Sequence, residues 1–132
     1  MAQGQNIKEE KSQVFVIEDD VLLNRAYNAK FEHENIKAVF ATDGDEALEM
    51  LSHEENRPKL ILLDLMLPKR SGFEVLEIIK KDPKLKDIPV IILSNLSLGS
   101  DSKRGLEAGA VEYITKADIK IADIVAKVKK YL

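Results

Sequence analysis

The chain has 132 residues and a formal net charge of −3 at pH 7, with 45% apolar and 33% charged residues. These values are typical of one globular domain and exclude a chain dominated by disorder. The acidic balance offers no basic surface for DNA or RNA, so we expect no nucleic-acid partner. No cysteine is present, which excludes disulfides, thiolate metal sites and cysteine nucleophiles.

Residues 1–12 are polar and lack the apolar stretch of a signal peptide, so they are expected to form a flexible tail before a folded domain at 13–132. A membrane span needs about 20 consecutive apolar residues. The longest apolar run, from Leu60 to Leu67, is interrupted by Asp64. We therefore expect a cytoplasmic protein without a membrane partner.

Three short, continuous apolar runs, at residues 14–17, 60–63 and 90–93, are typical of parallel strands that are covered on both faces. Two weaker runs, at residues 36–40 and 111–114, predict strands at or near the edges of the same sheet. Between the strands the apolar residues recur at helical spacing. These helical faces are Leu23, Ala26, Tyr27 and Phe31; Ala47, Leu48 and Leu51; Val75, Leu76 and Ile79; and Ile121, Ile124, Val125, Val128 and Leu132.

The helix expected between Ser97 and Gly109 is the weakest of the set. It contains two glycines and offers little to bury beyond Leu98 and Leu106. We therefore expect it to be the least stable element. The alternation of strand and helix predicts a (βα)₅ sandwich of the α/β class, with helices on both faces of a parallel sheet.

Open sheets of this kind bind ligands at the carboxyl ends of their strands. Four predicted strands end in residues with suitable chemistry, which are Glu18, Asp19 and Asp20 after the first, Asp64 after the third, Ser94 at the fourth and Lys116 after the fifth. Each alone has a simpler interpretation as a helix cap, a turn residue or a surface charge. Their joint placement at four strand ends favours a shared site.

The chemistry of that set is specific. Carboxylates crowded into one cleft repel each other unless a cation intervenes, and Mg²⁺ prefers oxygen ligands. A carboxylate can act as a nucleophile and form an acyl phosphate, while a metal, a lysine and a hydroxyl neutralise charge on the phosphoryl oxygens. Every one of these roles has a candidate among the residues at the strand ends.

Several motifs follow one another in order along the chain, and they are Val16-Ile17-Glu18-Asp19-Asp20, Leu62-Leu63-Asp64-Leu65-Met66-Leu67-Pro68 with Ser71-Gly72, Pro89-Val90-Ile91-Ile92-Leu93-Ser94, Gly105-Leu106-Glu107-Ala108-Gly109-Ala110 and Tyr113-Ile114-Thr115-Lys116. With these motifs, the sequence from Val14 to Leu132 resembles the receiver domains of two-component response regulators, of the single-domain chemotaxis-regulator type. This resemblance implies a flavodoxin-like three-layer sandwich with strand order 2-1-3-4-5.

The resemblance also implies roles for individual residues. Asp64 matches the phosphoacceptor, and Lys116 and Ser94 match the residues that contact the phosphoryl group. Glu18, Asp19, Asp64 and the backbone carbonyl of Met66 match the Mg²⁺ ligands, with Asp19 the stronger candidate for direct contact. Tyr113 and Ser94 match the switch residues, although strands favour aromatic residues anyway and Tyr113 has a packing role as its alternative.

Three positions depart from the commonest family pattern. Lys116 is followed by Ala117 instead of proline, and because a cis bond before a non-proline residue costs about 3 kcal/mol, the loop is either trans or strained. The acidic pair begins with Glu18 rather than Asp, and Asn95 follows Ser94 where a small residue is common. The positions that resemble those tuning hydrolysis, Met66 and Leu96, are apolar, which predicts a long-lived phosphoryl form.

The resemblance predicts a signalling switch, not an enzyme, with a sensor histidine kinase or histidine phosphotransfer protein as donor. The output would be a protein-binding surface around the fourth helix, fifth strand and fifth helix, acting on a downstream protein or on a second copy of the chain in a phosphorylation-dependent homodimer. Since the chain ends after the last predicted helix, a stand-alone receiver is expected.

Three alternatives remain open. One is a receiver-like interaction module that is not phosphorylated. A second is a haloacid-dehalogenase-type phosphohydrolase, which lacks its usual acid because Met66 stands at that position. A third is a dinucleotide-binding unit, but no Gly-x-Gly-x-x-Gly follows the first strand.

Overall fold

A computed structural model describes residues 13–96 and 99–132, so the expected tail at 1–12 lies outside the described residues. Five parallel strands form one sheet in the order β2-β1-β3-β4-β5, which confirms the predicted flavodoxin-like order. The strands are β1 (Val14–Ile17), β2 (Ala38–Ala41), β3 (Leu60–Leu63), β4 (Val90–Ser94) and β5 (Glu112–Thr115). The two weakly apolar strands, β2 and β5, are the edges, as their composition predicts.

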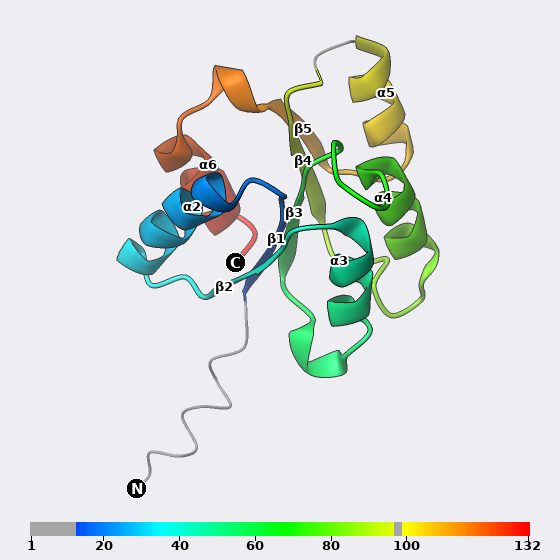
Figure 1. Cartoon of the computed structure of the whole chain (residues 1–132), viewed down its shortest axis with the longest axis horizontal. Helices are drawn as coiled ribbons and strands as arrows, with labels where there is room; N and C mark the ends of the chain where they lie inside the picture. The colour runs from blue at the N-terminus through cyan, green and yellow to red at the C-terminus, as the bar shows by residue number, and fades with distance from the viewer. Residues whose placement is uncertain (1–12, 97–98) are drawn as a thin grey trace, which may run out of the picture.

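Within residues 13–96 and 99–132 five α-helices alternate with the strands, and they are α2 (Val21–His33), α3 (Gly44–Leu51), α4 (Gly72–Lys81), α5 (Gly99–Glu107) and α6 (Ile121–Lys129). Short 3₁₀ turns, η2 (Glu54–Asn56) and η3 (Lys116–Asp118), precede β3 and α6. Figure 1 shows α2 and α6 on one face of the sheet and α3, α4 and α5 on the other. The sandwich therefore has three layers. No helix among the described residues is long and apolar enough to cross a bilayer.

Side-chain caps begin three of the helices directly after strand-end loops. The carboxylate of Asp20 accepts a hydrogen bond from the Leu23 amide at 3.1 Å, and that of Asp43 accepts one from the Glu46 amide at 2.7 Å. Ser71 and Glu74 form a reciprocal capping box at the start of α4. Because each cap satisfies amides that the first helical turn leaves unpaired, it fixes where the preceding loop ends.

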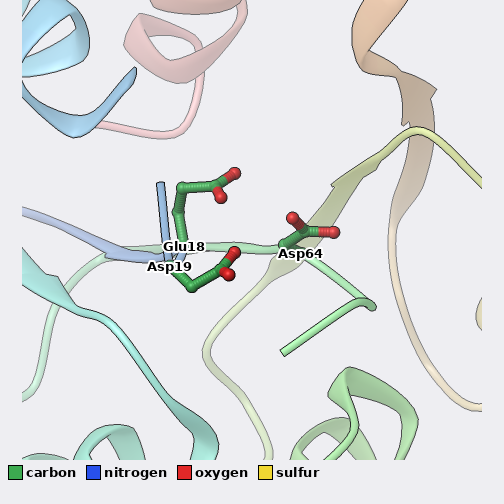
Figure 2. A group of neighbouring side chains, drawn as sticks. All are labelled: Glu18, Asp19 and Asp64. Carbon is green, nitrogen blue, oxygen red and sulfur yellow. The ribbon is translucent and has the colours of Figure 1, made fainter. Parts of the chain in front are cut away.

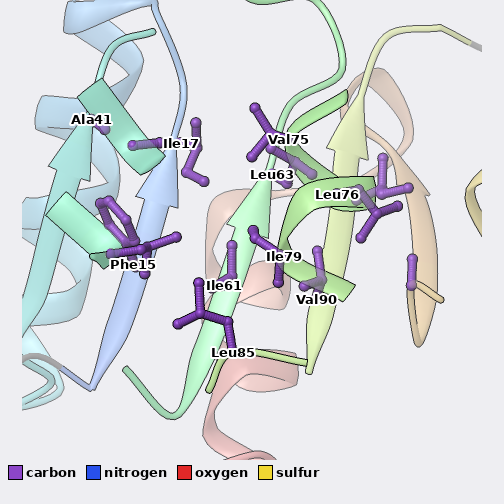
Figure 3. Packing of buried hydrophobic residues seen from close by; sticks show 14 of the residues in the cluster. Phe15, Ile17, Ala41, Ile61, Leu63, Val75, Leu76, Ile79, Leu85 and Val90 are labelled. Atoms are coloured by element: carbon purple, nitrogen blue, oxygen red, sulfur yellow. The ribbon is translucent and has the colours of Figure 1, made fainter. Parts of the chain in front are cut away.

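The strands bury both faces of the sheet, so alternate side chains enter two separate cores. Figure 3 shows one of them, in which Phe15, Ile17, Ile61 and Leu63 lie near residues of α4 such as Ile79. The opposite core joins Val14, Val16, Leu60 and Leu62 to α2 and α6. This burial on both faces explains why the sequences of the central strands are continuous apolar runs.

Two details of the predicted helical faces were wrong. Ala26 is exposed, and the buried face of α2 contains Asn24 beside Tyr27 and Phe31. Leu106 is 45% exposed, and the buried residue of α5 is Gly105, where an added Cβ would meet Ile92 Cδ1 at 2.5 Å. Helix α5 therefore packs by close approach of its backbone, while Leu98 lies outside the described residues.

Candidate functional site

The residues predicted from the strand ends converge at one edge of the sheet. Glu18 and Asp64 directly follow β1 and β3, which are neighbours in the sheet with Ile17 paired to Leu63. Both carboxylates are buried, at 3% and 5% exposure, whereas Asp19 is exposed. Two buried anions at adjacent strand ends need compensating positive charge.

Lys116 supplies that charge. It begins η3, directly after β5, and its Nζ lies 2.7 Å from Asp64 Oδ2 and also contacts Glu18 Oε1. The remaining oxygens are held by backbone amides, because Asp20 N donates to Glu18 Oε2 at 3.0 Å and Met66 N donates to Asp64 Oδ1 at 3.1 Å. The two carboxylates are thus oriented by charge-assisted hydrogen bonds on both sides.

A third carboxylate completes an acidic group. Figure 2 shows the side chains of Glu18 and Asp19 turned toward the side on which Asp64 lies, and one oxygen from each of the three lies within 4.8 Å of the others. That spacing and the all-oxygen donor set suit a hard divalent cation such as Mg²⁺, which keeps several waters and takes few protein ligands. The residues present therefore fit a magnesium site.

Burial changes the proton affinities of the buried groups. It raises the pKa of Glu18 to about 7, although the hydrogen bonds from Lys116 and Asp20 act in the opposite direction. Burial works against the ammonium of Lys116 as well, but hydrogen bonds to Asp64 and Glu18 outweigh it and hold the Lys116 pKa above its ordinary value. A proton or a metal ion is therefore favoured close to Glu18 while Lys116 stays charged.

Asn24, which was not predicted as a site residue, supports the loop after β1. Its Nδ2 donates to the backbone carbonyl of Glu18 at 2.8 Å, and the side chain is 7% exposed. Tyr27, one helical turn further along α2, is fully buried, and burial raises its pKa to about 12. A polar residue on the otherwise apolar face of α2, four residues after the cap at Asp20, was the available signal.

Ser94 and Tyr113, the predicted switch residues, belong to the neighbouring strands β4 and β5 and both bind Leu96. Ser94 ends β4, is fully buried, and its Oγ accepts a 3.4 Å hydrogen bond from the Leu96 amide. The Tyr113 hydroxyl donates to the Leu96 carbonyl, and its ring lies beside Gly105 of α5. Tyr113 thus links β5 to the loop after β4, and burial raises its pKa.

The peptide bond between Lys116 and Ala117 is trans, as are all others in the described residues. Of the predicted site residues, the structure joins Glu18, Asp64 and Lys116 by direct contacts and places the carboxylate of Asp19 with them. Met66 contacts Asp64 through its amide, while its side chain is 57% exposed.

Residues 14–129 match the family described as the response regulator receiver domain. The Klebsiella pneumoniae phosphate regulon transcriptional regulatory protein PhoB is 36% identical over 88% of this chain. The Brucella anthropi polar-differentiation response regulator DivK is 33% identical over 90% of this chain. The chain spans 49% of the PhoB sequence and 94% of DivK, and it covers only about half of several other curated relatives.

Solved structures agree with these relatives. The phosphorylated cyanobacterial phytochrome response regulator RcpA is 35% identical, with a TM-score of 0.77 over 90% of this chain and 89% of its own. The Mn²⁺-bound form of response regulator Rcp1 is 31% identical, with a TM-score of 0.76 over 90% of each chain. Both likenesses extend over nearly all of the described residues.

Proposed function

Because the chain belongs to the response regulator receiver domain family, we propose that Asp64 accepts a phosphoryl group in a Mg²⁺-dependent reaction. The observation that carries the proposal is the contact of the Lys116 ammonium with the buried carboxylates of Asp64 and Glu18. Receiver domains take their phosphoryl groups from histidine kinases and act on downstream targets, so a sensor kinase or a histidine phosphotransfer protein would be the donor.

In the proposed step an Asp64 oxygen attacks the phosphorus of a phosphohistidine. The bond from phosphorus to the imidazole nitrogen breaks, its electron pair stays on the nitrogen, and an acyl phosphate forms on Asp64. Bound Mg²⁺ would neutralise negative charge on the phosphoryl oxygens. The ion would be held by Asp19, Asp64 and the Met66 carbonyl, and by Glu18 directly or through water.

The residues around Asp64 have distinct tasks in this scheme. The Lys116 ammonium, 2.7 Å from Asp64 Oδ2, would transfer its hydrogen bond to a phosphoryl oxygen, and the Ser94 hydroxyl would donate to another. Movement of Ser94 would shift the loop whose Leu96 carbonyl holds Tyr113. The surface formed by α5, β5 and α6 would then present a different shape to a partner protein or to a second copy of the chain.

The proposed phosphoryl form is long-lived. Hydrolysis needs a water that is oriented toward the phosphorus, and the exposed thioether of Met66 and the apolar side chain of Leu96 give it no hydrogen bond. The same thioether argues against the phosphohydrolase alternative, because that chemistry needs an acid at position 66. A stand-alone receiver stays a prediction.

The test compares the wild type with Asp64→Asn after incubation with acetyl phosphate and Mg²⁺, followed by a phosphate-affinity gel. Asp123→Asn, an exposed carboxylate on α6, is the matched control. The wild type and the control should shift, Asp64→Asn should not, and a chelator should abolish the shift. A shift in all three proteins, or in none, would contradict the proposal, and the second result would favour an interaction module that is not phosphorylated.

A further inference from the structure

The pairing of β4 with β5 continues beyond the strands through a side chain. The last backbone pair in register is Ser94 with Thr115. One residue further along, Asn95 Oδ1 accepts a hydrogen bond of 3.2 Å from the amide of Ala117. The side chain of Asn95 therefore extends the β4–β5 pairing to the residue that directly follows Lys116.

The amide that Asn95 binds belongs to the peptide unit between Lys116 and Ala117. Fixing this peptide plane limits the backbone conformation of Lys116, and so the direction in which its side chain leaves the chain. That side chain must reach Asp64 past the intervening strand β4. A proline at position 117 would offer no amide proton, so this contact depends on a non-proline residue.

Asn95 is also the middle one of three consecutive residues that all contact the segment 113–117. Ser94 pairs with Thr115, Asn95 binds Ala117, and the Leu96 carbonyl accepts from Tyr113. The last residue of β4 and the two residues that follow it thus contact residues 113–117. A change at Ser94 would reach Lys116 through this connection as well as through the proposed phosphoryl group.

We propose that Asn95 is a positioning residue that holds Lys116 within reach of Asp64 through the amide of Ala117. The inference rests on the proposed phosphorylation of Asp64. Since the hydrogen bond is exposed and single, its removal should slow phosphorylation by about threefold to tenfold, not abolish it. The affinity for Mg²⁺ should stay within about twofold, because Asn95 is not part of the acidic group.

Two substitutions of nearly equal shape distinguish the effect of the hydrogen-bonding oxygen of Asn95 from the effect of side-chain size. Asn95→Asp keeps an oxygen that can accept from Ala117, and Asn95→Leu does not. Asn95 is exposed, so neither substitution removes a buried contact and neither variant should unfold. Asn28→Ala, a half-buried residue of α2 outside the site, is the control.

The measurement is the initial rate of phosphorylation by acetyl phosphate with saturating Mg²⁺, together with a Mg²⁺ titration. We expect Asn95→Leu to be slow, and Asn95→Asp and the control to keep at least half of the wild-type rate. Equal rates in both Asn95 variants, fast or slow, would overturn the inference, as would a parallel loss of Mg²⁺ affinity in Asn95→Leu. If the wild type itself takes no phosphoryl group, the proposed function fails instead.

Discussion

Lys116 Nζ lies 2.7 Å from Asp64 Oδ2, although 52 residues separate the two positions in the chain. Their strands, β5 and β3, are not neighbours, because β4 lies between them and places them about 10 Å apart. Only a long side chain at the end of β5 can cover that distance. The contact therefore depends on the sheet order, on the length of lysine and on the buried charge at β1 and β3.

Replacing Lys116 with methionine keeps much of the length and removes the charge. Asp64 and Glu18 would then lie close together without a cation, so the phosphorylation rate should fall by at least about tenfold, while Mg²⁺ should bind as well or better. Acetyl phosphate assays and Mg²⁺ titrations measure both effects. Lys127→Met is the control. The Nζ of Lys127 lies 2.7 Å from Glu112 Oε2, and neither residue belongs to the acidic group. A normal phosphorylation rate in Lys116→Met would contradict this role.

The affinity for Mg²⁺ should depend on pH through Glu18, whose pKa burial raises to about 7. Below that pH a proton occupies the carboxyl and competes with the metal, so the affinity should fall by up to about tenfold per pH unit between pH 7 and pH 5. Calorimetric titrations of the wild type and of Glu18→Gln test this. The variant should bind more weakly at pH 8 and vary less with pH, and an equal slope in both proteins would refute the assignment.

The same pKa predicts the opposite trend for stability in the absence of metal. A carboxyl whose pKa is higher in the folded state than in the unfolded chain stabilises the fold when protonated. This contribution is complete below the ordinary pKa of 4.5 and is lost as the pH rises through about 7. Urea unfolding with a chelator should therefore show the wild type losing stability between pH 5 and pH 8 relative to Glu18→Gln. Added Mg²⁺ should cancel the loss.

The strand ends were predictable because two regularities coincide in this sequence. Doubly buried strands give uninterrupted apolar runs, so Asp64 after Leu60–Leu63 and Ser94 within Val90–Ser94 stand out by position. Parallel strands bring their carboxyl ends to one edge, so the strand pattern alone predicts that Glu18, Asp64 and Lys116 share a site. Strand order followed from the resemblance and not from the periodicity.

Contacts that depend on side-chain direction were not predictable in the same way. Asn24 interrupts an apolar helical face, and only the path of the loop at Glu18 explains its burial. The amide of Ala117 in η3 and the oxygen of Asn95 after β4 form a hydrogen bond that depends on the paths of two loops, and residue type carries no signature of those paths. The packing of α5 at Gly105 depends on how closely its backbone approaches the side chains of Ile92 and Tyr113, which composition does not encode.

Gly72 is required for the close approach of α4 to the backbone of Asp64 and Leu65. A Cβ at this position would lie 2.3 Å from the Asp64 carbonyl oxygen and 2.5 Å from Leu65 Cα, and backbone atoms cannot move aside as a side chain can. Gly72→Ala should lower the free energy of unfolding by about 1–3 kcal/mol and displace Asp64. Gly99→Ala is the control, because its Cβ would have no neighbour within 4 Å. Urea unfolding measures both, and equal stability would show that α4 can move without penalty.

The lifetime of the phosphoryl group should be set in part by position 66. The Met66 amide donates to Asp64 Oδ1 at 3.1 Å, so the residue is fixed beside the proposed acceptor, and its side chain is exposed to solvent. An amide there can hold an attacking water, so Met66→Asn should shorten the lifetime by about tenfold. The measurement follows loss of the label from purified phosphoprotein, with Ile78→Asn, an exposed apolar residue of α4, as control. Loss within seconds in the wild type, or equal lifetimes in Met66→Asn and the wild type, would show that something other than Met66 governs access of water.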